Sequence, residues 1–94
     1  MQKVTFFYID GCPYCEQARR ARAELIAEHP EYAAVEFEEF EEHANEALAD
    51  QYDYWCTPSM FIGKEKLYES YLFEPYAEAK AHVKAVLDRA LEAE

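Results

Sequence analysis

Residues that interrupt regular structure are scarce in this sequence, which has 2 glycines and 4 prolines among its 94 residues. That scarcity excludes a collagenous chain, and a hydrophobic content of 51% excludes a broadly disordered or low-complexity one. Basic residues are also few: 9 lysines and arginines stand against 20 acidic residues, for a formal net charge of -11. Nucleic acid and anionic membranes repel such a chain, so we expect neither as a partner.

Long apolar runs are missing as well. No stretch approaches the roughly 20 apolar residues that span a bilayer, and the first residues lack the features of a cleaved signal peptide. Cysteines number 3, which is odd and too few for a secreted scaffold held by disulfides. The sequence therefore predicts a cytoplasmic, monomeric protein in which residues 1–94 form a single domain.

Hydrophobic periodicity predicts the element order β-α-β-α-β-β-α. A βαβ unit gives a parallel strand pair through a right-handed crossover, and a hairpin then adds antiparallel strands. We therefore predict an α/β fold, with a four-stranded mixed sheet and three helices distributed over both of its faces. Strands are expected at Val4–Ile9, Val35–Glu38, Ser59–Ile62 and Lys66–Glu69, and helices from Pro13 to His29-Pro30, between Ala44 and Tyr52, and from Pro75 to Leu91.

Acidic residues are concentrated between Glu36 and Glu46. The alternation of apolar and acidic residues at Val35–Glu38 is typical of a strand with one solvated face, near a sheet edge. We interpret the acidic stretch as a solvated face, and a docking face for a basic partner is the alternative.

The segment that carries chemistry is Cys12-Pro13-Tyr14-Cys15, where the first strand passes into the first helix. Two cysteines separated by two residues can close a disulfide across one helical turn. Cys12 falls at the helix N-terminus, where unpaired backbone N–H groups and the macrodipole stabilise a thiolate. Cys15 lies one turn inside and is expected to be more covered, so we predict that Cys12 attacks a disulfide and Cys15 resolves it.

Other interpretations of this cysteine pair are half of a zinc site or two inert thiols. Zinc needs two further ligands, and Cys56 with one of the three histidines would supply the number. No second C-x-x-C or H-x-x-x-H is present to hold them at ligand spacing. We therefore favour redox chemistry and assign no metal ligand.

Thr57-Pro58 forms the second signal, directly before the third strand. Proline cannot donate to a sheet ladder, so it belongs at the start of a strand. We favour a cis Thr57–Pro58 bond, which would turn the loop toward the dithiol. Cys56 is interpreted as a small buried hydrophobe, with a third redox thiol as the alternative. Trp55 is interpreted as a loop anchor, with a substrate contact as the alternative.

With these segments in view, the sequence resembles the glutaredoxins of the thioredoxin superfamily. Cys12-Pro13-Tyr14-Cys15 is the motif of dithiol glutaredoxins, and Thr57-Pro58 followed by Met60–Gly63 resembles the family's cis-proline loop and next strand. The resemblance implies a thioredoxin fold over the whole chain, reversible thiol–disulfide exchange, and glutathione as the usual reductant. It also makes Pro13, Tyr14, Thr57 and Pro58 substrate-binding candidates, with Tyr14 exposed and walling the substrate groove.

Two departures bear on glutathione. Where glutaredoxins often carry a basic residue before the first cysteine, this chain has Ile9 and Asp10. Where the family has two glycines followed by acidic residues, this chain has Tyr68–Leu72. The Thr57 backbone can still pair with an extended thiol peptide, because that contact needs no particular side chain.

The sequence thus predicts an enzyme: a glutathione-linked protein-disulfide oxidoreductase of glutaredoxin type, acting in electron transport and cell redox homeostasis. Its partners are expected to be glutathione, as a co-substrate, and protein disulfides, with no tightly bound cofactor. The alternatives are a thioredoxin-like reductase partner that does not use glutathione, and a binding module that holds an iron–sulfur cluster or zinc.

Overall fold

A computed structural model describes residues 2–92, and its elements follow the predicted order with one short 3-10 helix added after the first helix. Within that part of the chain, no helix is long and apolar enough to cross a bilayer. The strands are β1 (Val4–Tyr8), β2 (Phe37–Glu41), β3 (Ser59–Ile62) and β4 (Glu65–Glu69). The helices are α1 (Pro13–Glu28), the 3-10 helix Pro30–Ala34, α2 (Glu46–Ala49) and α3 (Tyr76–Glu92).

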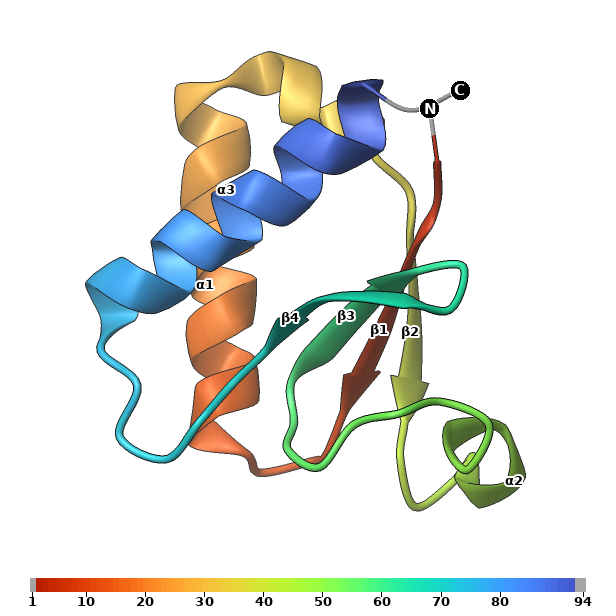
Figure 1. Ribbon diagram of the computed structural model, residues 1–94. Coiled ribbons are helices and arrows are strands. Elements are labelled where there is room, and N and C mark those ends of the chain that lie inside the picture. Colours follow the sequence, from red (N-terminus) through yellow and green to blue (C-terminus); the bar gives the residue numbers. More distant parts are fainter. Residues whose placement is uncertain (1, 93–94) are drawn as a thin grey trace.

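The four strands form one mixed sheet in the spatial order β2-β1-β3-β4 (Figure 1). β1 pairs in parallel with β2, Val4 lying opposite Phe37, and α1 is the helix of the crossover between them. β3 pairs antiparallel with both β1 and β4. The predicted α/β architecture with a four-stranded mixed sheet is confirmed, and β2 lies at a sheet edge as its acidic alternation indicated.

Adjacent phenylalanines of β1 point to opposite faces of the sheet, as the pleat requires. Phe6 belongs to the larger core, which α1 and α3 cover, while Phe7 belongs to a smaller core with Phe61 and Ala49 of α2. Figure 1 shows α1 and α3 together on one side of the sheet and α2 on the other. Because a short connection joins β1 to α1, the N-terminus of α1 follows the carboxyl end of a central strand that is buried from Val4 to Phe7.

The helix expected between Ala44 and Tyr52 is shorter than predicted, since α2 covers only Glu46–Ala49. The chain leaves the helix there because its aromatic side chains pack better on the sheet. Tyr52 and Tyr54 lie 4.9 and 5.2 Å from the Phe7 ring centroid. Aromatic packing of this kind adds to area burial and overrides a weak helical preference.

The second strand was expected at Val35–Glu38 and lies instead at Phe37–Glu41. The 3-10 helix occupies the preceding residues and leaves Val35 buried at its end, so pairing with β1 begins two residues later. Several carboxylates of the acidic stretch contact other parts of the fold, and Glu39 is paired with Arg19 and Arg22 of α1, each at 3.0 Å. The stretch is therefore partly a set of contacts between β2 and α1 rather than a uniformly solvated face.

Candidate active site

Cys12 caps the N-terminus of α1, with extended backbone angles of φ -80° and ψ 115°. Pro13 follows as the first helical residue, where its missing N–H leaves no bond unmade. The Cys15 N–H donates a hydrogen bond to Cys12 Sγ over 3.2 Å, and the Glu16 N–H reaches the Cys12 carbonyl at 3.1 Å. The sulfur therefore lies at the positive end of the helix dipole and accepts an N–H bond, an arrangement that favours negative charge on it.

Cys15 is fully buried one turn into α1, whereas Cys12 is partly exposed. Burial, together with the hydrogen bond shared with Cys12, raises the pKa of the Cys15 thiol to about 12. Near neutral pH this thiol stays protonated and does not compete as a nucleophile. The predicted difference in cover between the two cysteines is confirmed, while their roles remain predictions.

The loop before β3 faces the dithiol. Its Thr57–Pro58 peptide bond is cis, as the sequence predicted, and Pro58 is buried. Both the Thr57 carbonyl oxygen and Thr57 Oγ1 lie 3.8 Å from Cys12 Sγ, although 45 residues separate them along the chain. The carbonyl accepts from a thiol and the hydroxyl donates to a thiolate, so Cys12 has a partner in either protonation state.

Tyr14 is half-buried rather than exposed, because its hydroxyl accepts a hydrogen bond from the Phe73 N–H at 2.6 Å. Its ring lines a small hollow of about 230 Å³ beside the dithiol. Thr57 lines the same hollow, so these two predicted substrate-binding residues come together. Pro13 is exposed at the helix start and Pro58 is buried, and neither is among the residues that line the hollow. The lining residues are Tyr14, Cys56, Thr57, Ser70, Tyr71 and Leu72.

Cys56 and Trp55 were expected to be buried and anchored, and both expectations are wrong. Cys56 is exposed, and 91% of Trp55 is accessible to solvent. The loop is held by its main chain instead: the N–H groups of Trp55 and Cys56 donate to the same Glu69 carboxylate oxygen at 2.5 and 2.7 Å. Because the backbone is bound to the end of β4, the two side chains are free to project outward.

Glu69 also forms an ion pair with Lys66 at 2.7 Å. Partial burial acts to raise the pKa of Glu69, but the ion pair and the two N–H bonds outweigh it and hold that pKa below its usual value. The negative charge of Glu69 is thus satisfied within the protein. Two N–H donors that an incoming carboxylate would otherwise use are occupied.

The positions that differ from glutaredoxins offer little to a carboxylate. Asp10 is exposed, Ile9 is half-buried, and no charged side chain is among those that line the hollow. The nearest buried acid of the following segment is Glu74, whose Oε1 accepts from the hydroxyls of Tyr68 and Ser70 at 2.5 and 2.8 Å. Glu74 therefore holds β4 and the loop after it, and does not face a ligand.

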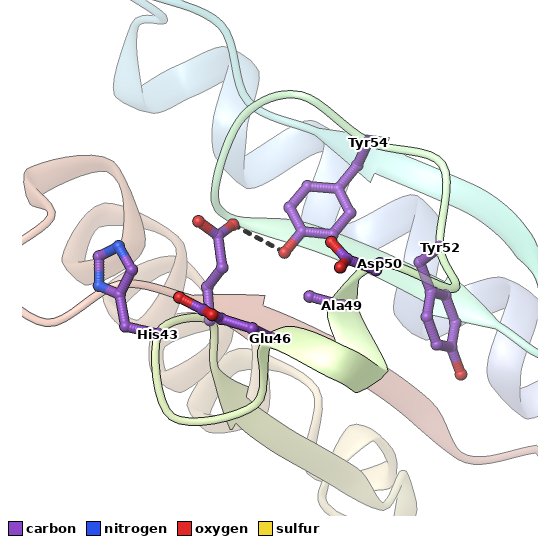
Figure 2. A pocket seen from close by; sticks show the side chains of 7 residues that line it. His43, Glu46, Ala49, Asp50, Tyr52 and Tyr54 are labelled. Atoms are coloured by element: carbon purple, nitrogen blue, oxygen red, sulfur yellow. Dashed lines mark hydrogen bonds between the residues drawn. The ribbon is translucent and has the colours of Figure 1, made fainter.

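A larger hollow of about 390 Å³ lies away from the dithiol, beside α2. Figure 2 shows that His43, Glu46, Asp50, Tyr52 and Tyr54 surround it, and the Tyr54 hydroxyl donates to Glu42 at 2.7 Å. Among residues 2–92, no group of three or more histidine, cysteine or acidic side chains is placed to hold a metal ion. No cysteine is among the residues that line this hollow, so we assign the thiol chemistry to the smaller hollow.

The sequence analysis named Leu72 only as part of the departure at Tyr68–Leu72 and did not name Phe73, and the structure places both beside the hollow. One signal was available: Tyr71-Leu72-Phe73 is an apolar run too short for a strand or helix, between a strand and Pro75. The bonds from Glu69 to the loop at Trp55 and Cys56 left no sequence signal, because they depend on how β4 lies against that loop.

Comparison with known proteins supports the fold. No model of a protein family matches the sequence, and no curated protein matches it either. Among solved structures, the chain is similar to thioredoxin 1 from the thermophilic eubacterium Thermosipho africanus TCF52B. The TM-score is 0.54 at 13% sequence identity, over 95% of this chain and 98% of that one. At that identity the likeness concerns architecture alone: the chain has the thioredoxin fold.

Proposed function

We propose that the protein is a thiol–disulfide oxidoreductase of glutaredoxin type, with Cys12 as the nucleophile and Cys15 as the resolving thiol. The observation that carries the proposal is the contrast between the two sulfurs. Cys12 Sγ accepts a helix N-terminal N–H and faces Thr57, while Cys15 is buried and protonated. A helix N-terminus lowers the energy of a thiolate, and the thiolate is the reactive species.

In the first step the Cys12 thiolate attacks one sulfur of a substrate disulfide. A bond forms between Cys12 and that sulfur, the substrate disulfide breaks, and the departing thiolate takes up a proton from solvent. In the second step Cys15 loses its proton and attacks Cys12 Sγ. The mixed disulfide breaks, the second substrate thiol leaves, and a Cys12–Cys15 disulfide remains, so that two electrons have passed from the protein to the substrate.

Pro13, Tyr14, Thr57 and Pro58 are proposed to position the substrate. Thr57 is the closest of them to the reacting sulfur, at 3.8 Å, and an extended peptide can lie along its backbone. Pro58 forms the cis bond with Thr57, Pro13 is the first residue of α1, and Tyr14 lines the hollow.

Glutathione is proposed as a co-substrate that regenerates the dithiol, two molecules giving up two electrons and forming one glutathione disulfide. The second candidate reductant is a thioredoxin-type reductase protein. The side chains that line the hollow include no charged one, which favours this candidate because a carboxylate of glutathione finds no cationic partner among them.

The test compares three single variants in the reduction of bis(2-hydroxyethyl) disulfide. Cys12→Ser should abolish reduction. Cys15→Ser, mixed with the disulfide before any reductant is added, should accumulate a mixed disulfide that mass spectrometry detects on Cys12. Cys56→Ser keeps both cysteines of the motif and should retain reduction of this small disulfide, which separates the role of the third thiol from that of the pair. The assay is run with glutathione and glutathione reductase, and in parallel with thioredoxin reductase, to identify the reductant. Full activity of Cys12→Ser would overturn the proposal.

A further inference from the structure

Exposed large apolar side chains are confined to two places in the described part of the chain, residues 2–92. Trp55 lies in the loop before β3, and the other three follow one another in the loop between β4 and α3. The exposed fractions are 91% for Trp55, 45% for Tyr71, 68% for Leu72 and 81% for Phe73. An apolar group of this kind marks a binding surface more often than scattered single residues do.

The two loops meet at the hollow of about 230 Å³ beside the dithiol. The Ser70 N–H donates to the Pro58 carbonyl at 3.0 Å, which joins the start of one loop to the end of the other. Thr57 lines the hollow and lies 3.8 Å from Cys12 Sγ. A side chain held in the hollow is therefore next to the attacking sulfur.

Phe73 is held in a conformation that does not suit it. Its φ is +69°, the left-handed region where bulky residues are rare and glycine or asparagine are preferred. The Tyr14 hydroxyl holds this backbone by accepting the Phe73 N–H at 2.6 Å. Since the Phe73 side chain is 81% exposed, core packing does not repay the strain. Strain that persists at an exposed aromatic residue is characteristic of sites that bind.

The surface is unsuited to an anionic occupant. Tyr14, Cys56 and Leu72 give the hollow an apolar wall, and its lining includes no basic side chain. The two loop N–H groups that a carboxylate would seek are taken by Glu69. With a formal net charge of -11, the protein also repels acidic peptides at long range.

We propose that this surface binds a large apolar side chain of a polypeptide disulfide substrate, located next to the cysteine that Cys12 attacks. We name it the 71–73 surface: Tyr71, Leu72 and Phe73, of which Tyr71 and Leu72 line the hollow together with Cys56 and Thr57. The substrate segment is extended and neutral or basic. The inference rests on the proposed thiol–disulfide exchange and adds its substrate class. A second copy of the chain is the competing occupant, which the charge of -11 on each copy disfavours.

The test uses two symmetrical peptide disulfides that are identical except for leucine or serine beside the cysteine. Single-turnover reduction by the native protein should be about tenfold faster for the leucine peptide, as partial burial of one leucine side chain predicts. Bis(2-hydroxyethyl) disulfide, which has no such side chain, serves as the reference substrate.

Two variants locate the effect. Leu72→Ser removes part of the wall, and Phe73→Asn removes the aromatic ring while keeping a residue that tolerates a positive φ. Each should reduce the leucine-to-serine rate ratio to about 3 or less, and Phe73→Asn should unfold at no lower urea concentration than the native protein. Ala85→Ser, at an exposed position of α3 outside the hollow, is the matched control and should keep the native ratio.

The outcomes separate the two proposals. If the native protein fails to reduce the reference disulfide, the proposed function fails and the substrate class falls with it. If it reduces the reference disulfide but treats both peptides equally, or if both variants keep the native ratio, only the 71–73 surface is overturned. Sedimentation as a dimer that Phe73→Asn dissociates would also overturn it, by assigning the surface to a second copy.

Discussion

A thiol reacts as its thiolate, so the surroundings of each cysteine determine the order in which the three react. Cys12 is partly exposed and accepts an N–H at the start of α1. Cys56 is exposed in a loop, with no helix terminus beside it. Cys15 is fully buried, and its raised pKa of about 12 keeps it in the neutral form. We therefore expect the three thiols to differ in reactivity, with Cys12 the most reactive and Cys15 the least.

Brief treatment with iodoacetamide near neutral pH should label Cys12 first, Cys56 second and Cys15 last. Because the Cys15 pKa is raised, its thiolate is a very small fraction near pH 7 and grows about tenfold with each unit of pH up to about 12. Peptide mass spectrometry at about pH 7, 8 and 9 should show that rise for Cys15. Cys56→Ser is the control and should leave the Cys12 rate unchanged. Preferential labelling of Cys56 in the native protein would contradict the assignment of Cys12 as nucleophile.

At the scale of elements, the sequence predicted the features that residues close together along the chain determine. Periodicity placed β3 at the observed Ser59–Ile62, and His29-Pro30 was expected to close the first helix, which ends at Glu28. The C-x-x-C motif and Thr57-Pro58 were enough to predict that the two loops face one another. The predictions of the second helix and the second strand were inaccurate because both depend on residues distant in sequence. The aromatic side chains after α2 pack on Phe7, and β2 starts where its residues pair with β1. The exposure of Trp55 depended on Glu69, a contact between two elements.

A buried hydrogen-bond network centred on Glu74 joins β4 to α3. Its carboxylate accepts the Tyr68 and Ser70 hydroxyls, and its other oxygen lies 3.1 Å from His82 Nδ1. Glu74 and Ser70 are each 3% exposed and Tyr68 is 4% exposed, so water does not replace a lost partner. Burial and the bond to Glu74 raise the pKa of Tyr68, which keeps its hydroxyl a donor.

Glu74→Ala should lower the free energy of unfolding by about 2–5 kcal/mol, because it leaves two buried hydroxyls without an acceptor. Urea denaturation measures the change, with the slope m expected to stay constant. Glu74→Gln keeps an acceptor oxygen and should lose less. Glu36→Ala, which removes an exposed carboxylate, is the control and should show no measurable change. Equal stability of Glu74→Ala and the native protein would show that the network does not support the loop.

At the scale of the whole molecule, the acidic side chains behind the net charge of -11 differ in whether a basic side chain lies beside them. Glu69 is paired with Lys66, and Glu39 with Arg19 and Arg22. Asp10, two residues before Cys12, is exposed, and its N–H donates to the carboxylate of Glu41. An anion that approaches the dithiol therefore meets a negative field, with Asp10 among its nearest sources.

Glutathione carries two carboxylates and one ammonium group, so we predict that the protein reacts with it but holds it weakly. Raising ionic strength should improve the apparent affinity, because screening shortens the reach of the repulsion to about 8 Å near physiological salt. Asp10→Lys should improve it further at low salt, by about two- to fivefold for a charge reversal near the thiol in a water-like dielectric. Glu36→Lys makes the same change of charge before the first residue of β2, at the opposite end of the β1–β2 strand pair from Cys12, and should have a much smaller effect. The measurement is the glutathione dependence of mixed-disulfide reduction by each protein at low and high salt. An affinity that is high at low salt and falls as salt rises would reveal an attractive basic site and refute the argument from charge.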